Sequence, residues 1–154
     1  MVLVRLIAEA FCQWRSRYFP SRKPPRNAAH VLGQLGEDLA ARYLGKHRYK
    51  ILYRNFRGPR GGEVDIICRD KSCATLVFVE VKTRSSAHFG TPAQAVTTAK
   101  QRLIARGAIA WLRLLDEPRV QFRFDIVEVY MSGLRCSKIN LIRNAFQLPE
   151  PYYY

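Results

Sequence analysis

Two strand-like segments joined by a short turn constrain the fold of this chain more than any other feature. Residues 63–69 and 75–84 are rich in Val, Ile, Leu and Phe, and a polar turn at residues 70–73 lies between them. Apolar runs of this length, bounded by turn residues, predict two β-strands that pair as an antiparallel hairpin. The rest of the chain must therefore supply further strands and the helices that cover a sheet.

The segments on either side of the hairpin predict an α/β domain. Before the hairpin, hydrophobic periodicity and turn residues predict a helix at 28–47, a strand at 49–56 and a turn at 58–62. After it they predict a second helix, which begins at Thr91 and Pro92 and ends near Leu115, and two strands at 120–130 and 134–142. A strand, a long helix and a second strand in succession predict a crossover between parallel neighbours. We therefore expect a mixed five-stranded sheet flanked by helices, in the order α-β-β-β-α-β-β.

Apolar residues at helical spacing predict the buried faces of the two helices. The stripe of the first helix is Leu32, Leu35, Leu39 and Tyr43, and that of the second is Val96, Ala99, Leu103, Ala110, Trp111 and Leu114. Glu37 lies about 140° away from the first stripe on a helix that turns 100° per residue. Its carboxylate is therefore predicted to lie among small side chains, where either a ligand or plain solvent could reach it.

The charge of the chain favours a polyanionic partner. The sequence has 26 Lys and Arg against 12 Asp and Glu, which gives a net charge of +14. Such a charge is typical of proteins that bind nucleic acid, although an anionic membrane surface would also attract it. We expect nucleic acid, and DNA rather than RNA.

Residues 1–27 are predicted to form an extension outside the domain. Apolar residues repeat there at helical spacing with arginines off the stripe, which predicts a basic amphipathic helix, and the Pro-rich residues 20–27 read as a linker. The helix is too short and too charged to span a membrane, and no signal-peptide cleavage site follows it. Residues 28–148 are the predicted domain and residues 149–154 a tail.

Cysteine and histidine residues predict neither a disulfide framework nor a zinc site. Cys12, Cys68, Cys73 and Cys136 form no CxxC pair, and the three histidines share no ligand spacing. Reduced thiols of this kind indicate an intracellular, cytoplasmic protein. His88 is not expected to act as a general base.

Glu80 is unusual because it lies inside the apolar run at residues 76–81. Strand alternation places Glu80 on one face with Phe78 and Lys82. A hairpin centred between residues 72 and 73 places Asp65 opposite Glu80, and Glu63 opposite Lys82, with Glu63 and Asp65 on one face. A register shift of one residue would separate the carboxylates.

Two opposed carboxylates need a compensating charge. Opposed side chains on paired strands start only about 5 Å apart at Cβ, and two ionised carboxylates at that distance repel by roughly 4 kcal/mol at an effective dielectric near 20. The compensating cation is either Lys82, in a structural salt bridge, or a divalent metal. Carboxylate oxygens suit Mg²⁺ or Mn²⁺, with a backbone carbonyl, water and phosphate completing the ligands.

The same residues resemble a nuclease signature. Asp65, fourteen intervening residues and the triplet Glu80-Val81-Lys82 match the PD-(D/E)XK pattern. The segments "LGEDLAARYL", "RGGEVDIICRD", "LVFVEVKTR" and "FDIVEV" resemble the YraN-like family of small, largely uncharacterised bacterial proteins, itself similar to archaeal Holliday-junction resolvases. The resemblance covers residues 29–147. The superfamily's usual proline before the Asp is replaced by Val64.

The resemblance implies a restriction-endonuclease-like fold and a Mg²⁺- or Mn²⁺-dependent endonuclease acting on structured or branched DNA. It implies that Asp65 and Glu80 bind the metal, that Lys82 assists the attacking water and that Glu37 completes the acidic pocket. A junction-cutting role would imply a symmetric homodimer, because two opposed strands must be cut. The alternative is a non-catalytic nucleic-acid-binding protein on the same scaffold.

Four further residues are candidates for binding nucleic acid. Lys100 and Gln101 on the second helix would face the site or a phosphate, or else lie on a solvated helix face. Arg60 in the turn and Arg84 after the third strand would contact the backbone of nucleic acid. Asp125 is expected to make a structural hydrogen bond rather than a metal contact.

Overall fold

The computed structural model describes residues 28–85, 96–116 and 119–150. Its elements are α2 (Ala28–Lys46), β1 (Tyr49–Arg57), β2 (Glu63–Asp70), β3 (Thr75–Ser85), α3 (Thr98–Leu114), β4 (Phe122–Ser132) and β5 (Arg135–Phe146). The predicted helix within residues 1–27, together with Thr91, Pro92 and His88, lies outside the described residues. Neither α2 nor α3 has the length and hydrophobicity needed to cross a membrane.

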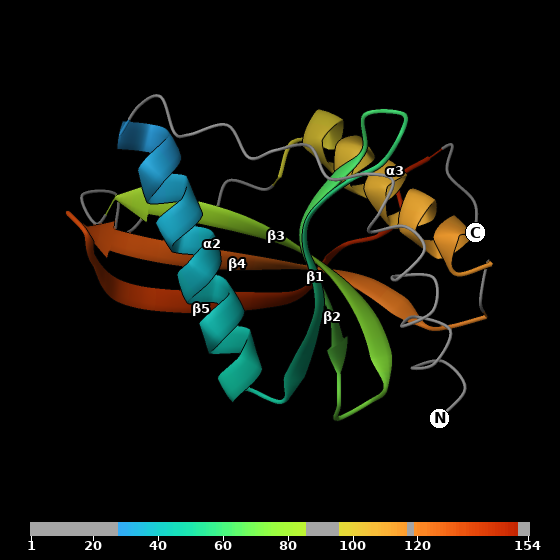
Figure 1. The fold of residues 1–154 in the computed structure, drawn as a ribbon, viewed down its shortest axis with the longest axis horizontal. Helices are drawn as coiled ribbons and strands as arrows, with labels where there is room; N and C mark the ends of the chain where they lie inside the picture. Colours follow the sequence, from blue (N-terminus) through green and yellow to red (C-terminus); the bar gives the residue numbers. More distant parts are fainter. Residues whose placement is uncertain (1–27, 86–95, 117–118, 151–154) are drawn as a thin grey trace, which may run out of the picture.

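The five strands form one mixed sheet in chain order, β1-β2-β3-β4-β5. Every neighbouring pair is antiparallel except β3 and β4, which α3 connects as parallel neighbours. Figure 1 shows α2 beside one end of the sheet and α3 beside the other. The predicted mixed five-stranded sheet flanked by helices is confirmed, including the parallel crossover.

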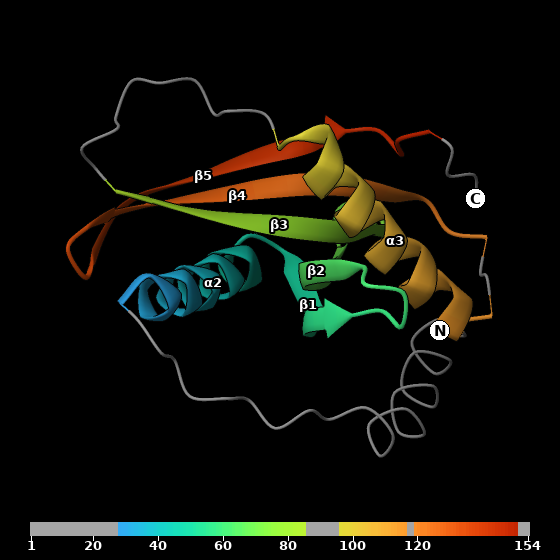
Figure 2. The same cartoon turned by 90° about the horizontal axis from the view of Figure 1, so that it is seen from above.

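Each face of the sheet has its own apolar core. On one face Ala40 and Leu44 of α2 pack against Ile66, Val79 and Val127. On the other face α3 covers a larger core, which contains Phe56, Val64, Ile67, Phe78, Ile104, Trp111, Leu112, Phe124 and Phe146. Figure 2 shows the same arrangement from above, with α2 and α3 lying beside different parts of the sheet. The core under α3 contains the first residues of β3 and β4, such as Leu76, Phe78, Phe124 and Ile126, and does not extend to the C-terminal halves of these strands.

The buried faces of both helices differ from the predicted ones. In α2 the fully buried positions are Gly36, Ala40 and Leu44, while the predicted stripe of larger residues is only partly buried. Small side chains allow the closest approach to the sheet, so the larger ones flank the contact. In α3, Ala99 is exposed and Leu114 is 40% exposed.

The helix α3 also begins later than predicted. Thr97 is its N-cap, and the Thr97 side-chain oxygen accepts a hydrogen bond from the Lys100 N–H at 3.4 Å. Val96 is buried but precedes the helix. The buried residues of α3 include Ile104, Ala108, Trp111 and Leu112, of which the predicted stripe contained only Trp111.

The strands β2 and β3 separate at the point where the acidic residues lie. Their pairing runs from Asp70 with Thr75 to Ile66 with Val79 and ends there. Beyond this point β2 continues to pair with β1, and β3 continues to pair with β4. The predicted register is confirmed over the paired residues, but the ladder ends one pair before Asp65 and Glu80.

Strand alternation is also interrupted beside Asp65. Val64 packs in the core under α3, whereas Ile66, two residues later, packs in the core under α2. On the neighbouring strand Asn55, which lies between the partners of Val64 and Ile66, has a φ of 55°. This left-handed residue twists β1 and β2 locally. Simple alternation therefore does not describe the strand between Val64 and Ile66.

Backbone contact fixes α3 against the start of β2. A Cβ atom added to Gly107 would lie 2.9 Å from Val64 Cγ2 and 3.0 Å from the backbone of Glu63. A Cβ atom on Gly62 would lie 2.2 Å from the Gly107 nitrogen. Two glycines are therefore needed where the helix and the strand meet, and this contact holds Lys100, earlier in α3, near Glu63.

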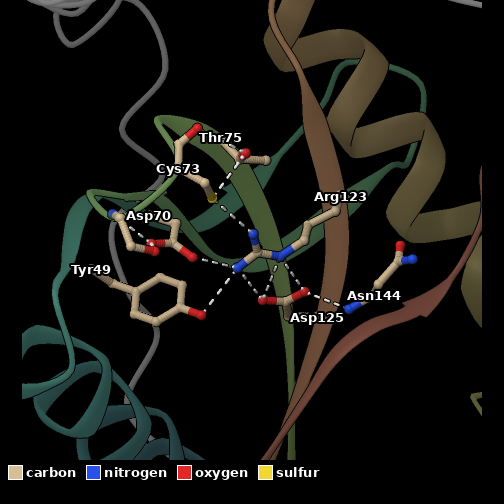
Figure 3. Close-up of polar contacts among 8 residues, drawn as sticks. Tyr49, Asp70, Cys73, Thr75, Arg123, Asp125 and Asn144 are labelled. Carbon is tan, nitrogen blue, oxygen red and sulfur yellow. Dashed lines mark hydrogen bonds and ion pairs between the residues drawn. The ribbon is translucent and has the colours of Figure 1, made fainter.

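Arg123 and Asp125 together link four strands, β1, β2, β4 and β5, next to the turn between β2 and β3 (Figure 3). It binds Asp70 through Nη2 at 2.9 Å and Asp125 through Nε at 2.9 Å, and it donates to the Tyr49 hydroxyl at 3.0 Å. Asp125 also accepts a hydrogen bond from the Asn144 N–H at 2.9 Å. The predicted structural hydrogen bond of Asp125 is confirmed.

Candidate active site

Glu80 is a buried carboxylate that two lysines compensate. Glu80 is only 3% exposed to solvent. Lys82 Nζ lies 2.9 Å from Glu80 Oε1, and Lys100 Nζ lies 3.2 Å from Glu80 Oε2. The contact to Oε2 lacks hydrogen-bond geometry, and among the described residues this buried oxygen has no hydrogen-bond partner. One oxygen of Glu80 is therefore compensated by charge alone.

Asp65 lies at the separation of β2 and β3, where its carboxylate replaces a ladder contact. The Val81 N–H donates to Asp65 Oδ2 at 2.7 Å. Burial, and then the negative charge of Glu80, raise the pKa of Asp65 to about 7, although the Val81 N–H and Lys100 oppose this rise. The pair is therefore close enough for mutual repulsion, as the sequence predicted.

Lys100 reaches this pair from α3 and joins it to Glu63. Its Nζ lies 2.5 Å from Glu63 Oε1 as well as near Glu80. Burial alone would lower the pKa of Lys100, but the hydrogen bond to Glu63 and the charges of Glu80 and Asp65 raise it. The hydrogen bond from Lys100 lowers the pKa of Glu63. We name Glu63, Asp65, Glu80, Lys82 and Lys100 the acidic cluster.

Glu37 approaches the acidic cluster from α2. The helix comes close to β3 here, since a Cβ atom on Gly36 would lie 1.9 Å from Thr83 Oγ1. The charge of Glu37 contributes to the raised pKa of Asp65. Its Oε2 atom is buried and has no hydrogen-bond partner within the described chain. Glu37 therefore lies close enough to Asp65 for their charges to interact.

The other candidate residues lie outside the acidic cluster. The Gln101 side chain donates to the Val96 carbonyl at 2.8 Å, at the start of α3. Arg60 is exposed in the turn before β2. Arg84 lies on the same strand as Glu80, but its Nε donates to Glu128 Oε1 at 3.0 Å. Only Lys100, of the four predicted nucleic-acid contacts, joins the carboxylates directly.

Two carboxylates missed as candidates by sequence reasoning have polar partners in the structure. Glu63 was expected opposite Lys82 and instead binds Lys100, because the strands separate before that pair forms. Glu128, 1% exposed, binds Arg84. The sequence did contain a signal for Glu128. Like Glu80 in β3, it is a charged residue inside an apolar run, here that of β4.

The acidic cluster suits a hard divalent cation only if protein carboxylates are a minority of the ligands. Within the described residues, no group of three or more His, Cys, Asp or Glu side chains is arranged to hold a metal ion. Mg²⁺ typically uses one or two protein carboxylates together with water and phosphate. Asp65 and Glu80 fit that requirement, because both supply carboxylate oxygens, Glu80 Oε2 lacks a hydrogen bond, and a bound cation would offset the repulsion that raises the pKa of Asp65.

Comparison with known proteins finds relatives over most of the chain. The sequence model of the uncharacterised protein family UPF0102 matches residues 36–129. A UPF0102 protein of Geobacter metallireducens is 51% identical over 117 residues, which are 76% of this chain and 93% of that protein. A UPF0102 protein of Caldicellulosiruptor saccharolyticus is 47% identical over 116 residues, 75% of this chain and 96% of that protein. The matched range includes Glu37 and the whole acidic cluster, and none of these names states an activity.

Proposed function

The chain belongs to the uncharacterised protein family UPF0102, the YraN-like family that its segments resemble, and we propose that it is a metal-dependent endonuclease acting on structured or branched DNA. The meeting of Asp65, Glu80 and Lys82 where β2 and β3 separate carries this proposal. Two carboxylates with an adjacent lysine are the groups that cation-assisted phosphodiester hydrolysis needs. Their order along the chain is that of the PD-(D/E)XK nucleases, and similarity to archaeal Holliday-junction resolvases is part of the proposal.

In this proposal Asp65 and Glu80 hold Mg²⁺ or Mn²⁺, and Glu37 completes the pocket from α2. When bound, the ion supplies a Lewis acid that polarises a phosphoryl oxygen and lowers the pKa of a bound water. Lys82, beside Glu80, orients the attacking water and balances the charge that develops on the phosphate. Lys100 is held at the same carboxylate and adds a second positive charge to the phosphate-binding side.

The proposed partner is nucleic acid, with DNA preferred to RNA. The net charge of +14 supports binding through phosphates. Arg60, Arg84, Lys100 and Gln101 remain the proposed contacts to the backbone. Cutting two opposed strands of a junction would require two active sites, so a symmetric homodimer is part of the proposal.

A non-catalytic nucleic-acid-binding protein is the second candidate function. It is favoured by one observation: lysines already lie against both oxygens of Glu80. A buried carboxylate compensated in this way is also a stable structural arrangement without any metal. The two candidates predict the same binding and differ in cleavage.

A cleavage assay separates them. We would incubate the full chain with duplex, single-stranded and four-way-junction DNA in Mg²⁺ or Mn²⁺, beside Glu80→Ala and Lys82→Ala. Both variants are expected to lose cleavage by at least about 100-fold, the usual contribution of a positioned acid–base or electrostatic group. Both should retain salt-sensitive binding. Asp116→Asn, a charge change at an exposed residue, is the matched control and should cleave normally.

Each outcome of this assay supports one candidate. Cleavage that persists equally in Glu80→Ala and Lys82→Ala would point to a contaminating nuclease. Binding without cleavage in either metal would favour the non-catalytic protein. Loss of cleavage only in the two cluster variants, with the control intact, would support the endonuclease.

A further inference from the structure

The face of the sheet that carries the acidic cluster continues into a polar surface. On β3, Lys82 and Arg84 follow Glu80 on the same face, and on β4 their register partners are Glu128 and Tyr130. On β5, Asn140 pairs with Glu128 and Lys138 pairs with Tyr130. We name these six residues beyond Glu80 the polar face: Lys82, Arg84, Glu128, Tyr130, Lys138 and Asn140. It lies on the C-terminal halves of β3 and β4, away from α3 (Figure 1).

Glu128 is the buried centre of the polar face. Its side chain is 2% exposed, yet it accepts three hydrogen bonds there. Arg84 Nε donates to Oε1 at 3.0 Å, while the Tyr130 hydroxyl and Asn140 Nδ2 donate to Oε2, both at 3.2 Å. Both oxygens are therefore satisfied, and a buried carboxylate with this many donors holds its partners in fixed positions.

The contact to Glu128 fixes Arg84 in a particular orientation. Arg84 uses Nε for Glu128, and its side chain remains 24% exposed. Within the described part of the chain its two terminal nitrogens make no hydrogen bond or ion pair, so they can donate to a ligand. A guanidinium presents two parallel N–H donors that match the oxygens of a phosphate. An arginine whose Nε is already bound to a carboxylate loses little side-chain entropy when it binds a phosphate.

The distance along β3 defines what Arg84 would contact. Glu80 and Arg84 are four residues apart on one strand, which spans about 13 Å at 3.3 Å per residue. A group at that distance would reach the backbone of a bound nucleic acid several nucleotides from a phosphate at the acidic cluster. Lys82 lies between them and Lys138 lies beside them, so cations extend along the whole path.

We propose that the polar face is the path of duplex DNA leaving the acidic cluster, with Arg84 as a phosphate-binding residue and Glu128 as the positioning residue that holds it. Tyr130 and Asn140 act through Glu128. This inference rests on the proposed nucleic-acid function and deepens it, because it names a backbone contact away from the reacting phosphate. It does not depend on cleavage.

The test is duplex-DNA binding in EDTA, measured by fluorescence anisotropy over a range of KCl concentrations. Arg84→Lys keeps the charge but loses the planar donors and the Nε contact, and it is expected to weaken binding roughly three- to tenfold. Arg84→Ala is expected to reduce the slope of log affinity against log salt by about 1. The cleavage assay is separate, so its failure would not affect this result.

Glu128→Gln gives the sharper result, because net charge and the positioning of Arg84 predict opposite changes in DNA affinity. It raises the net charge by one unit, so simple electrostatics predicts tighter binding. Loss of the anchor for Arg84 predicts binding roughly three- to tenfold weaker, with no further loss in the Arg84→Ala background. Glu150→Gln makes the same charge change at an exposed residue and should bind equally or slightly more tightly.

Different results would overturn the inference about the polar face and the proposed nucleic-acid function on which it rests. If the wild-type chain binds duplex DNA but Arg84→Lys and Glu128→Gln bind as well as wild type, the polar face is not the path. If Glu128→Gln does not fold, as judged by circular dichroism, wild-type affinity in Arg84→Lys overturns the inference alone. If the wild-type chain binds phosphatidylserine vesicles and not DNA, the proposed nucleic-acid function fails as well.

Discussion

Glu80 illustrates how this chain accommodates a carboxylate inside an apolar strand. An ionised side chain that is almost fully buried is destabilising unless it is paired. Two lysines, from β3 and α3, lie within 3.2 Å of its oxygens. Asp65 receives less compensation, since its direct partner is a backbone N–H, and its pKa is raised. The stability cost of the acidic cluster is therefore concentrated at Asp65.

Replacing Asp65 by Asn is expected to stabilise the protein at neutral and alkaline pH. Burial and the charge of Glu80 raise the pKa of Asp65 to about 7, against about 3.9 in the unfolded chain. The folded state therefore binds more protons between these values, so the stability that the protonated side chain contributes is present below pH about 4 and is lost as the pH rises through about 7. Asn is uncharged and still accepts from the Val81 N–H. We expect Asp65→Asn to be more stable by about 1–3 kcal/mol at pH 8.

Urea unfolding at pH 8 and pH 5 in EDTA would measure this difference. The gain should shrink at pH 5, because Asp65 is then largely protonated in the folded wild type. Asp116→Asn removes a charge at an exposed residue whose φ of 60° also suits Asn, and its stability should change little at either pH. An Asp65→Asn variant less stable than wild type at pH 8 would show that Lys100 compensates Asp65 fully.

The main members of the site could be predicted because strand alternation and a short hairpin are local rules. They placed Asp65 near Glu80, and they placed Lys82 beside Glu80. Glu63 could not be paired correctly, because β2 and β3 separate beyond the pair of Ile66 with Val79, and local alternation does not show where a ladder ends. The contact of Lys100 with Glu80 depends on how a distant helix packs, which spacing along the chain does not reveal.

At the scale of the elements, the packing of α3 on β2 determines where Lys100 lies. The helix and the strand touch backbone to backbone at Gly107, where an added Cβ would lie 3.0 Å from the backbone nitrogen of Glu63. Glu63 is also the residue that Lys100 binds most closely. A small displacement of α3 would therefore move a lysine of the acidic cluster as well as weaken the core.

Two glycine substitutions on the helices are expected to have opposite effects. Gly107→Ala should destabilise the protein by about 1–3 kcal/mol, because the methyl group forces α3 away from β2. Gly33→Ala in α2 meets nothing within 4 Å and should stabilise by about 0.4–1 kcal/mol through its higher helix propensity. Thermal unfolding of both variants measures the difference. Equal effects would show that the contact at Gly107 relaxes easily.

The elements themselves were more predictable than their orientation. The order of helices and strands and the parallel pairing of β3 with β4 follow from periodicity and from the length of the crossover. The buried face of α2 was predicted from its largest apolar residues, whereas Gly36, Ala40 and Leu44 make the closest contact. Size complementarity between a helix and a sheet depends on both partners, and the helix sequence describes only one.

For the whole molecule, positive charge is spread over the extension and the domain. Residues 1–27 contain six Lys and Arg and one Glu, a net charge of +5, which leaves +9 of the total +14 for residues 28–154. The family match begins at residue 36, so the shared region lies within the part that carries the larger share of this charge. The polar face and the acidic cluster also lie there.

Removing residues 1–27 should therefore reduce, but not abolish, DNA binding. We expect the shortened chain to unfold within about 5 °C of the full chain, because both cores described here lie within residues 28–150. Its affinity for duplex DNA should fall with salt along a shallower slope, since fewer phosphates are neutralised. Binding to anionic vesicles that disappears with the deletion, together with no DNA binding in either chain, would favour a membrane-surface adaptor that uses its basic N-terminal segment. Loss of all DNA binding in the folded, shortened chain would instead place the essential contacts in the extension and contradict the polar face as the binding path.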